Sequence, residues 1–402
     1  MSTSKLTLNV QSEIGKLEAV MLHYPGPEVE NMTPKNAQRA LYSDILNLSI
    51  AQKEYAQLKG VLEKTSSVYK VSDLLEKVLE IPGQRSSLLQ KICLTEQAED
   101  YFDYLLELSS PQLTKVLIEG LPMQVKTLTD FLKEEYYALQ PLYNFYFTRD
   151  TSVTIGNTSL VCKMANAVRM RESFIVDAIF NSGLFFNGKT TNMYDASQND
   201  PSVKIEGGDV LVAREDVLLI GSGARTSPQA IDLLIQELCR EKSHKRHVIV
   251  QQLPETPESF IHLDMVLNSN PYKTVHIQIE NGKVVKISPT NNIPAALKKL
   301  GMEVEPVICG GKADDWDQER EQWHSGANFL AIAPGKVLSY ARNINTLEEL
   351  NKKGFEVVRA EDVISGKFDP ETSGKCVITL DGSELARGGG GPRCMTMPLR
   401  RQ

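Results

Sequence analysis

The sequence predicts an α/β fold that is interrupted by a helical segment, and two observations lead to this class. Short apolar strands alternate with amphipathic helices over most of the 402 residues, a pattern typical of α/β proteins. Between about residues 71 and 139 the pattern changes to helical spacing without strands. Hydrophobic residues make up 41% and charged residues 24% of the chain, as is ordinary for a globular protein.

The helical segment is predicted to hold five short helices. Pro82 with Gly83 breaks the first helix, and Gly120 ends the fourth, which begins at Ser110-Pro111. Five helices in succession without strands predict a bundle that packs on itself. The predicted helices cover about Val71–Leu79, Ser87–Leu94, Tyr101–Leu108, Ser110–Gly120 and Leu128–Tyr137.

The remainder of the chain alternates strands and helices. One helix begins at Ser227-Pro228, and another begins at Thr346, where Thr346 and Glu349 form a capping-box pair and Gly354 can end the helix. The predicted strands are Ala19–His23, Val153–Ile155, Val217–Ile220, His247–Gln251, Val275–Ile279, Phe329–Ile332 and Val337–Tyr340.

Charge and cysteine usage exclude several classes of protein. The net charge of −7 gives no indication of a nucleic-acid partner. No apolar run approaches the ~20 residues of a membrane span, and the first residues lack the apolar core of a signal peptide. The six cysteines are scattered without CxxC spacing, which indicates reduced thiols in the cytoplasm rather than a disulfide framework or a zinc site.

The last dozen residues contain a candidate nucleophile, Cys394. The four glycines at 388–391 precede Pro392, Arg393 and this cysteine, and glycines allow positive φ angles and close approach of the backbone. A neighbouring positive charge lowers the pKa of a thiol, and the thiolate is the nucleophilic form. The alternative is a flexible glycine-rich tail with an incidental buried cysteine.

Further polar clusters supply the other parts of a nucleophilic site. His262 and Asp264 are two residues apart, so a strand would put both on one face. A thiol, an imidazole and carboxylates are the parts that nucleophilic catalysis uses. The acids outnumber the one orienting group that a cysteine protease needs. The remaining clusters are Asn144 to Asp150, Glu206-Gly-Gly-Asp209, and the arginines Arg169, Arg171 and Arg225.

The excess of carboxylates indicates a cationic substrate. Converging carboxylates are costly unless a cation or protons compensate them. A guanidinium is always charged and offers five donors in a planar fork, which suits paired carboxylates. A metal ion is the alternative cation, but the sequence has no compact spacing of metal ligands, so no metal is predicted.

Taken together, these segments resemble those of the arginine deiminases, within the guanidine-modifying, amidinotransferase-like superfamily. Each match is modest alone, but the ordered set is specific and covers nearly the whole chain. The matching segments occur in family order and are Ser12–Leu17, Asn144–Asp150, Arg169-x-Arg171-Glu172, Glu206–Asp209, Gly223-x-Arg225, His262–Asp264, Arg320–Trp323 and Arg393–Pro398.

The resemblance implies a fold and a division into domains. It implies a pseudo-symmetric five-bladed α/β propeller of ββαβ units with the catalytic centre on its axis. Residues 1–72 and 143–402 would form this propeller, and residues 73–142 would be the inserted five-helix bundle.

The resemblance also implies a reaction and a role for each site residue. Free L-arginine would be hydrolysed to L-citrulline and ammonia through a covalent S-alkylthiouronium intermediate on Cys394, without a cofactor or a metal. Asp150 and Asp264 would hold the guanidinium, and His262, oriented by Glu206, would act as acid and base. The residues expected to bind the remainder of the substrate are Asn144, Phe147, Arg169, Arg225 and Arg393.

Two positions depart from the family pattern. Many members carry a second arginine five positions before the cysteine, where this chain has Gly389. The change could weaken the hold on free arginine or widen the mouth of the site. His324 stands in a loop where the family more often has an Asp-Gly pair, and a structural role is expected for it.

Three alternatives for the function stay open at this point. The chain could be an amidinotransferase, a deiminase of another guanidine compound, or an arginine-binding protein without activity. Three arginines available for a carboxylate argue against agmatine, which has none. The resemblance further implies self-association into a dimer or larger homo-oligomer, with no nucleic-acid or membrane partner.

Overall fold

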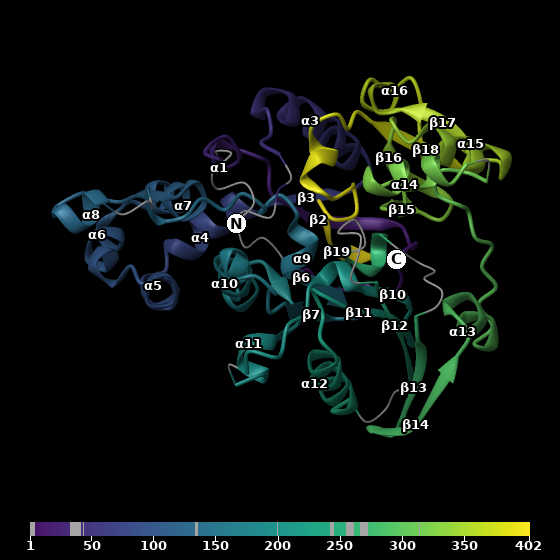
Figure 1. The fold of residues 1–402 in the computed structure, drawn as a ribbon, viewed down its shortest axis with the longest axis horizontal. Coiled ribbons are helices and arrows are strands. Elements are labelled where there is room, and N and C mark those ends of the chain that lie inside the picture. The colour runs from purple at the N-terminus through teal and green to yellow at the C-terminus, as the bar shows by residue number, and fades with distance from the viewer. Residues whose placement is uncertain are drawn as a thin grey trace.

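The computed structural model describes residues 5–32, 42, 44–132, 136–198, 200–241, 245–254, 261–265, 272–312 and 314–402. The chain has a mixed α/β fold in which several small sheets meet near the middle of the molecule, with helices outside them (Figure 1). None of the helices in these ranges combines the length and the apolarity that crossing a membrane requires.

One arrangement of elements occurs four times in the described residues. An antiparallel pair of strands is followed by a helix and by a strand that pairs in parallel with the second strand of the pair. The four units are β19 (Met397–Arg401), β2 (Leu17–Leu22), α3 (Leu48–Thr65) and β3 (Ser67–Lys70); β6 (Ser152–Ile155), β7 (Thr158–Val161), α10 (Met170–Asn181) and β9 (Lys189–Asn192); β10 (Val210–Arg214), β11 (Val217–Ser222), α12 (Pro228–Cys239) and β12 (Arg246–Gln252); and β15 (Leu330–Ala333), β16 (Lys336–Tyr340), α15 (Ile344–Lys352) and β18 (Cys376–Leu380).

Further elements extend these units. The hairpin of β13 and β14 lengthens the sheet of β10 to β12 by antiparallel pairing with β12, and β17 pairs in parallel with β18. These elements are β13 (Thr274–Glu280), β14 (Lys283–Thr290), α13 (Ile293–Lys299), α14 (Asp315–Trp323), β17 (Glu356–Arg359) and α16 (Ala360–Ile364), with the short α1 (Pro27–Glu30), α11 (Met193–Ala196), β1 (Leu6–Thr7) and β8 (Phe186–Asn187). All seven predicted strands are confirmed, with ends that differ by one or two residues.

The predicted helical segment contains helices and also a hairpin. The helices are α4 (Val71–Leu79), α5 (Pro82–Glu96), α6 (Phe102–Glu107), α7 (Ser110–Glu119) and α8 (Leu128–Leu132). The expectation of no strands is wrong, because β4 (Leu121–Pro122) pairs with β5 (Tyr137–Leu139). The predicted fifth helix partly falls on residues outside the described ranges, and at its end the aromatic Tyr137 lies in a strand, a conformation that aromatic residues favour.

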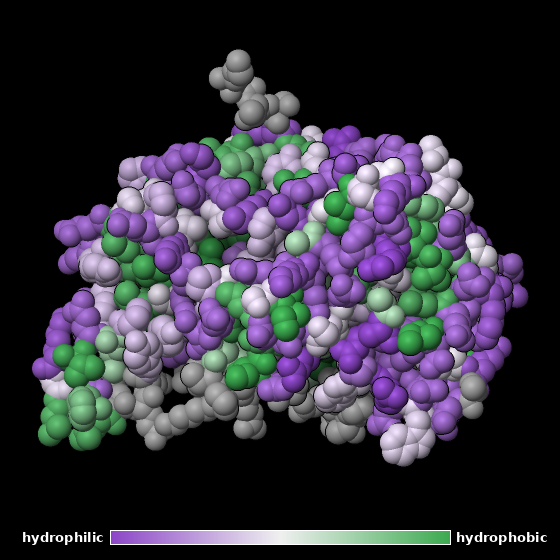
Figure 2. Space-filling model, turned by 90° about the horizontal axis from the view of Figure 1, so that it is seen from above, coloured by the Kyte–Doolittle hydropathy of each residue, from purple (hydrophilic) through white to green (hydrophobic). Residues whose placement is uncertain are grey.

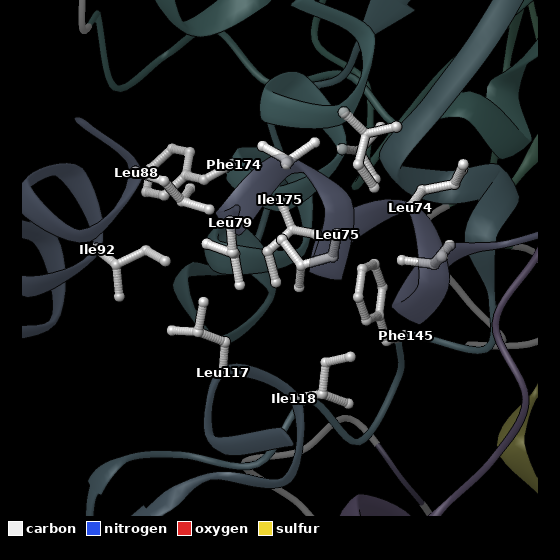
Figure 3. Packing of buried hydrophobic residues seen from close by; sticks show 14 of the residues in the cluster. Leu74, Leu75, Leu79, Leu88, Ile92, Leu117, Ile118, Phe145, Phe174 and Ile175 are labelled. Atoms are coloured by element: carbon white, nitrogen blue, oxygen red, sulfur yellow. The ribbon is translucent and has the colours of Figure 1, made fainter. Parts of the chain in front are cut away.

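These helices share a core with the rest of the fold. Leu75 and Leu79 of α4 pack in one buried cluster with Phe174 and Ile175 of α10, as Figure 3 shows from close by. The segment therefore does not pack only on itself. The division into residues 73–142 and the remainder stays a prediction.

The surface is mostly hydrophilic in the view of Figure 2, with a group of hydrophobic residues at its left end, where Figure 1 places α8. Leu128, Phe131 and Leu132 of α8 and the following Tyr136 are all exposed. Such a group is larger than the scattered apolar residues that are normal on a protein surface.

The N-cap of helix α15 lies three residues before the predicted one. Its N-cap is Asn343 rather than Thr346. The carboxylate of the buried Glu321 accepts hydrogen bonds from the N–H groups of Asn345 and Thr346, each at 2.8 Å, and from the Thr346 hydroxyl at 2.6 Å. A distant acid thus satisfies the first-turn donors that a local capping box would otherwise satisfy.

Candidate active site

The predicted site residues come from loops and short helical turns next to the strands. Asp150 lies in α9 (Thr148–Thr151), directly before β6, and Glu206 precedes the turn η3 (Gly207–Asp209) before β10. Cys394 lies between η6 (Leu385–Gly388) and β19. The expectation that His262 and Asp264 alternate along a strand is wrong, because Leu263–Met265 form the 3₁₀ turn η5.

The two glycines after Glu206 allow these loops to approach each other. A Cβ atom on Gly208 would lie 2.5 Å from Nδ1 of His262. A Cβ atom on Gly207 would lie 2.1 Å from the carbonyl oxygen of Arg149. Only glycine fits both positions without a shift. The Glu-Gly-Gly-Asp segment can therefore approach closely enough for Glu206 to contact His262.

His262 and Glu206 form a buried ion pair. Nε2 of His262 lies 2.9 Å from Oε2 of Glu206, and Nδ1 lies 3.8 Å from Oδ1 of Asp150. Burial alone would lower the pKa of His262, but Asp150, Cys394 and Glu206 raise it well above its usual range. Burial alone would raise the pKa of Glu206, but the hydrogen bond to His262 and the charge of Arg225 lower it to about 2. The imidazole is therefore charged at neutral pH.

Asp150 and Asp264 each have one carboxylate oxygen that accepts a hydrogen bond from an arginine and one that accepts none from the described residues. Arg169 donates to Oδ2 of Asp150 at 2.6 Å, and Arg393 donates to Oδ2 of Asp264 at 2.7 Å. Both Oδ1 atoms are buried and accept no hydrogen bond from any described residue. A buried acceptor without a donor is costly, so these two oxygens can accept from a donor that none of the described residues supplies.

Arg169 and Arg393 are held by acids and carbonyl groups. Both donate to a glutamate, which is Glu172 for Arg169 and Glu13 for Arg393. Nη2 of Arg169 also donates to the carbonyls of Asn144 and Phe147. Each arginine thus uses its Nε and both Nη atoms within the protein, and their predicted contact with a substrate carboxylate stays untested.

The thiol of Cys394 is buried and faces an acid and an amide. Sγ lies 3.5 Å from Oδ2 of Asp264, and Nδ2 of Asn328 lies 3.1 Å from Sγ. Burial and the charge of Asp264 raise the pKa of the thiol to about 11, although the hydrogen bond to His262 acts in the opposite direction. The surrounding side chains therefore favour the neutral thiol.

Two residues near the site had no predicted role, Asn328 and Asp209. Oδ1 of Asp209 accepts from the N–H of Leu263 at 2.9 Å, and Oδ2 accepts from the hydroxyl of Thr226 at 2.5 Å. Leu263 stands between His262 and Asp264, so Asp209 ties down the backbone that carries both. The position of Asn328 directly before a predicted strand was the only signal for it in the sequence, and that signal is weak.

The other predicted substrate-binding residues lie around the same site. Nη1 of Arg225 is 3.6 Å from Oε1 of Glu206, and its side chain is 18% exposed, so it can reach solvent. The ring of Phe147 is buried, and a Cβ atom on Gly390 would lie 2.4 Å from it. Asn144 is buried, and its carbonyl accepts from Arg169. His324 is the C-cap of α14, and its carbonyl accepts a hydrogen bond from Nδ2 of Asn343.

Asp150, Glu206 and His262 offer three ligand atoms within 4.8 Å of one another, which is the one such group among the described residues. Each of them already has an oppositely charged partner, since Arg169 pairs with Asp150 and His262 pairs with Glu206. Side chains therefore supply the positive charge that the two acids need.

The fold of the protein is similar to that of several solved structures. SxtG, described as an amidinotransferase of the saxitoxin biosynthetic pathway from Microseira wollei, matches with a TM-score of 0.52 and 15% identity, over 98% of this chain and 97% of that chain. The substrate-bound N-terminal domain of ArgZ, described as an arginine dihydrolase from cyanobacteria, matches with a TM-score of 0.51 and 12% identity, over 95% and 98%. The chain has an amidinotransferase-like α/β fold.

The sequence comparisons identify one family among the proteins that share this fold. The arginine deiminase family model matches residues 38–401. A protein from Listeria monocytogenes named arginine deiminase is 33% identical over 98% of each chain. Another of that name from Oenococcus oeni is 31% identical and covers 100% of this chain and 99% of its own. The chain belongs to the arginine deiminase family, which confirms the family that the sequence resembles.

Proposed function

We propose that this protein hydrolyses the guanidinium group of free L-arginine to L-citrulline and ammonia. Family membership over nearly the whole chain supports this reaction. The observation that carries it is the pair of buried Oδ1 atoms on Asp150 and Asp264, which accept no hydrogen bond from the described residues. Asp264 also contacts the thiol of Cys394 through its other oxygen, Oδ2. Two carboxylates that both act on the thiol of Cys394 suit a planar cation with several N–H donors.

Binding of arginine would activate the nucleophile. The guanidinium N–H groups would donate to Oδ1 of Asp150 and Oδ1 of Asp264, which fixes the guanidinium carbon at the sulfur. The added positive charge also favours the thiolate, because an opposite charge nearby lowers the pKa of a thiol. Cys394 would thus lose its proton to the solvent when the substrate is bound, although burial and the charge of Asp264 raise its pKa.

The charged His262 would then act first as an acid and later as a base. The thiolate attacks the guanidinium carbon, a terminal nitrogen takes the proton of His262, and ammonia leaves with the electrons of its C–N bond. This step gives an S-alkylthiouronium on Cys394. Neutral His262 next takes a proton from water, whose oxygen attacks the same carbon, and the sulfur leaves as thiolate. The hydroxyl proton of this adduct passes to the solvent, so that neutral citrulline is released. His262 is then charged again, and Glu206 stabilises this form.

Arg225 is the residue we assign to the substrate carboxylate. It is the partly exposed arginine of the predicted set, whereas Arg169 and Arg393 are buried and engaged by Asp150 and Asp264. Arg169 and Arg393 therefore act through the two aspartates they hold. Asn144 would assist at the amino-acid end, and Phe147 would pack on the aliphatic stem.

The proposal also covers the arrangement of the fold, the cellular location and the oligomeric state of the protein. The four ββαβ units, with β13, β14 and α13 as a partial fifth, support a five-bladed propeller around the site, with residues 73–142 as its insert. Six cysteines without a disulfide support a cytoplasmic protein. Self-association into a homo-oligomer is proposed from the family alone.

The test is incubation with L-arginine without added metal, followed by assay of citrulline and ammonia. Equal amounts of both products are expected from the parent, and neither from Cys394→Ala. Ornithine formed when glycine is supplied would replace hydrolysis by amidino transfer. If no product appears, Gly389→Arg is the first variant to assay, because it restores the arginine that many relatives carry.

A further inference from the structure

The side chain of Asn328 makes three hydrogen-bond contacts with Arg393 and Cys394. It stands two residues before β15, in a segment far from Cys394 in sequence, and is 1% exposed. Oδ1 accepts from the backbone N–H of Arg393 at 3.1 Å and from that of Cys394 at 3.2 Å. Nδ2 lies 3.1 Å from Sγ of Cys394. One amide thus contacts both the backbone and the sulfur of the cysteine.

The backbone contacts determine which end of the amide faces the sulfur. The N–H groups of Arg393 and Cys394 can only donate, so the atom they meet must be the carbonyl oxygen of Asn328. The NH₂ group is therefore directed at Sγ. An N–H donor stabilises a thiolate more than a thiol, because the thiolate is the stronger acceptor.

We propose that Asn328 is a catalytic residue of this site, whose amide N–H donates to the nucleophilic sulfur and stabilises the thiolate that attacks the substrate. This role rests on the proposed arginine hydrolysis. The same N–H also offsets the negative charge that returns to the sulfur when citrulline leaves. The two backbone contacts keep the donor in place, since they leave the amide no alternative orientation.

The thiol is surrounded by groups that act in both directions. Asp264 of η5 and Asp150 of α9 oppose its ionisation, and His262 favours it. The phenols of Tyr146 and of Tyr340 in β16 are also close enough to interact with it. Among these, His262 must give up its proton during turnover, whereas the amide of Asn328 keeps its donor throughout.

Asn328→Asp tests the role with little change of shape. The carboxylate can still accept from both backbone N–H groups, but it replaces the donor at the sulfur by a negative charge. The rate at which iodoacetamide alkylates Cys394 is followed by peptide mass spectrometry as a function of pH. We expect the apparent thiol pKa to rise by at least about one unit, so that alkylation at pH 8 is at least about tenfold slower.

Asn343→Asp is the matched control. Asn343 is also a fully buried asparagine, and its amide donates to the carbonyl of His324 in the preceding loop rather than to the sulfur. The same amide-to-acid change there should leave the pH profile of alkylation as in the parent. Asn328→Ala provides a second variant, in which kcat for arginine should fall while KM changes little, because the guanidinium hold of the aspartates remains.

A parent-like thiol titration in either folded Asn328 variant would overturn the proposal. Loss of the fold in both variants would overturn it too, because a residue that the whole fold requires has a structural role. The alkylation assay needs no turnover. A shifted thiol titration in the Asn328 variants, together with no citrulline from the parent protein, would therefore uphold the contact to the sulfur while refuting arginine hydrolysis.

Discussion

Asp150 and Asp264 are each held by an arginine, and each arginine is held in turn by a glutamate. The chains of contacts are Glu172–Arg169–Asp150 and Glu13–Arg393–Asp264. Each carboxylate is thereby fixed through one oxygen, and the other is the one we propose for the guanidinium. Such fixed acids do not need to reorganise when a guanidinium arrives, which favours tight and oriented binding.

Replacement of either aspartate by asparagine should remove most activity. Asp150→Asn and Asp264→Asn keep the shape but lose the negative charge that grips the guanidinium. A charge-assisted hydrogen bond contributes about 3 kcal/mol, so kcat/KM for arginine should fall about 100-fold or more in each variant. Asp216→Asn is the control, because Asp216 is a partly exposed acid paired with Arg214 outside the site. Normal turnover by either site variant would show that the guanidinium binds elsewhere.

Asp209 should make stability depend on pH. Burial raises its pKa from the ordinary 3.8 to about 7. The folded chain then holds this proton more tightly than the unfolded chain between about pH 4 and 7, so the stability it contributes at low pH is lost as the pH rises through this window. The shift corresponds to about 4 kcal/mol at most.

Urea denaturation at pH 4.5 and pH 8 measures this contribution. The free energy of unfolding of the parent should decrease between the two values relative to that of Asp209→Asn, which cannot titrate. The comparison between variants cancels the contributions of all other groups. Parallel pH profiles for the two proteins would mean that Asp209 is ionised in the fold, or that its charge is compensated.

The sequence predicts some site residues much better than others. Cys394, His262, Glu206, Asp150 and Asp264 each stand in a short polar segment that matches the family, and the structure brings them together. Asn328 escaped prediction because one asparagine before a strand has no pattern of its own. Its importance comes from the 66-residue separation of its contact with Cys394, which local spacing does not encode.

Two of the four glycines before the cysteine are required for different structural reasons. Gly389 has a left-handed backbone with φ of 81°, and a Cβ atom there would meet nothing within 4 Å. Gly390 is the opposite case, because a Cβ atom would lie 2.4 Å from the Phe147 ring and 3.0 Å from Cβ of Cys394. Gly389 allows the turn, and Gly390 allows the loop to pack on Phe147.

A pair of alanine variants should separate these two reasons. Gly390→Ala should displace Phe147 and Cys394, with a loss of about 1–3 kcal/mol in stability and a fall in kcat/KM. Gly389→Ala should cost only about 1 kcal/mol through its backbone angle, with activity retained. Thermal unfolding and citrulline assays on both variants check this. Equal activity in the two would show that the loop yields to an added methyl group.

The local sequence pattern did not predict where helix α15 starts. The Thr346 and Glu349 pair fits a capping box, yet the helix starts at Ile344, because Glu321 of α14 reaches the first-turn N–H groups. Strand positions were predicted well since apolar residues recur with a clear period. Helix ends depended on contacts between elements, which no short window of sequence contains.

At the scale of the whole molecule, the two ends of the chain meet in one sheet. β19 pairs antiparallel with β2, and the N–H of Arg401 donates to the carbonyl of Asn9 at 2.7 Å. Cys394 precedes this strand by three residues, so the position of the proposed nucleophile depends on the pairing of β19 with β2. Sequence pattern alone does not predict this pairing, since it joins segments almost 400 residues apart.

Removal of β19 should therefore abolish activity, although the removed residues play no part in the chemistry. A chain that ends at Thr396 loses the pairing of Met397 with Met21 and the buried Leu399. Loss of one buried leucine side chain alone costs about 2–5 kcal/mol, and the loop of Cys394 would lose its anchor. A chain that lacks only the exposed Gln402 is the control and should keep both its fold and its turnover of arginine. Citrulline assays with near-ultraviolet circular dichroism compare the two truncations. Full activity in the chain ending at Thr396 would mean that the contacts of Asn328 and of the glycine loop suffice to place the cysteine.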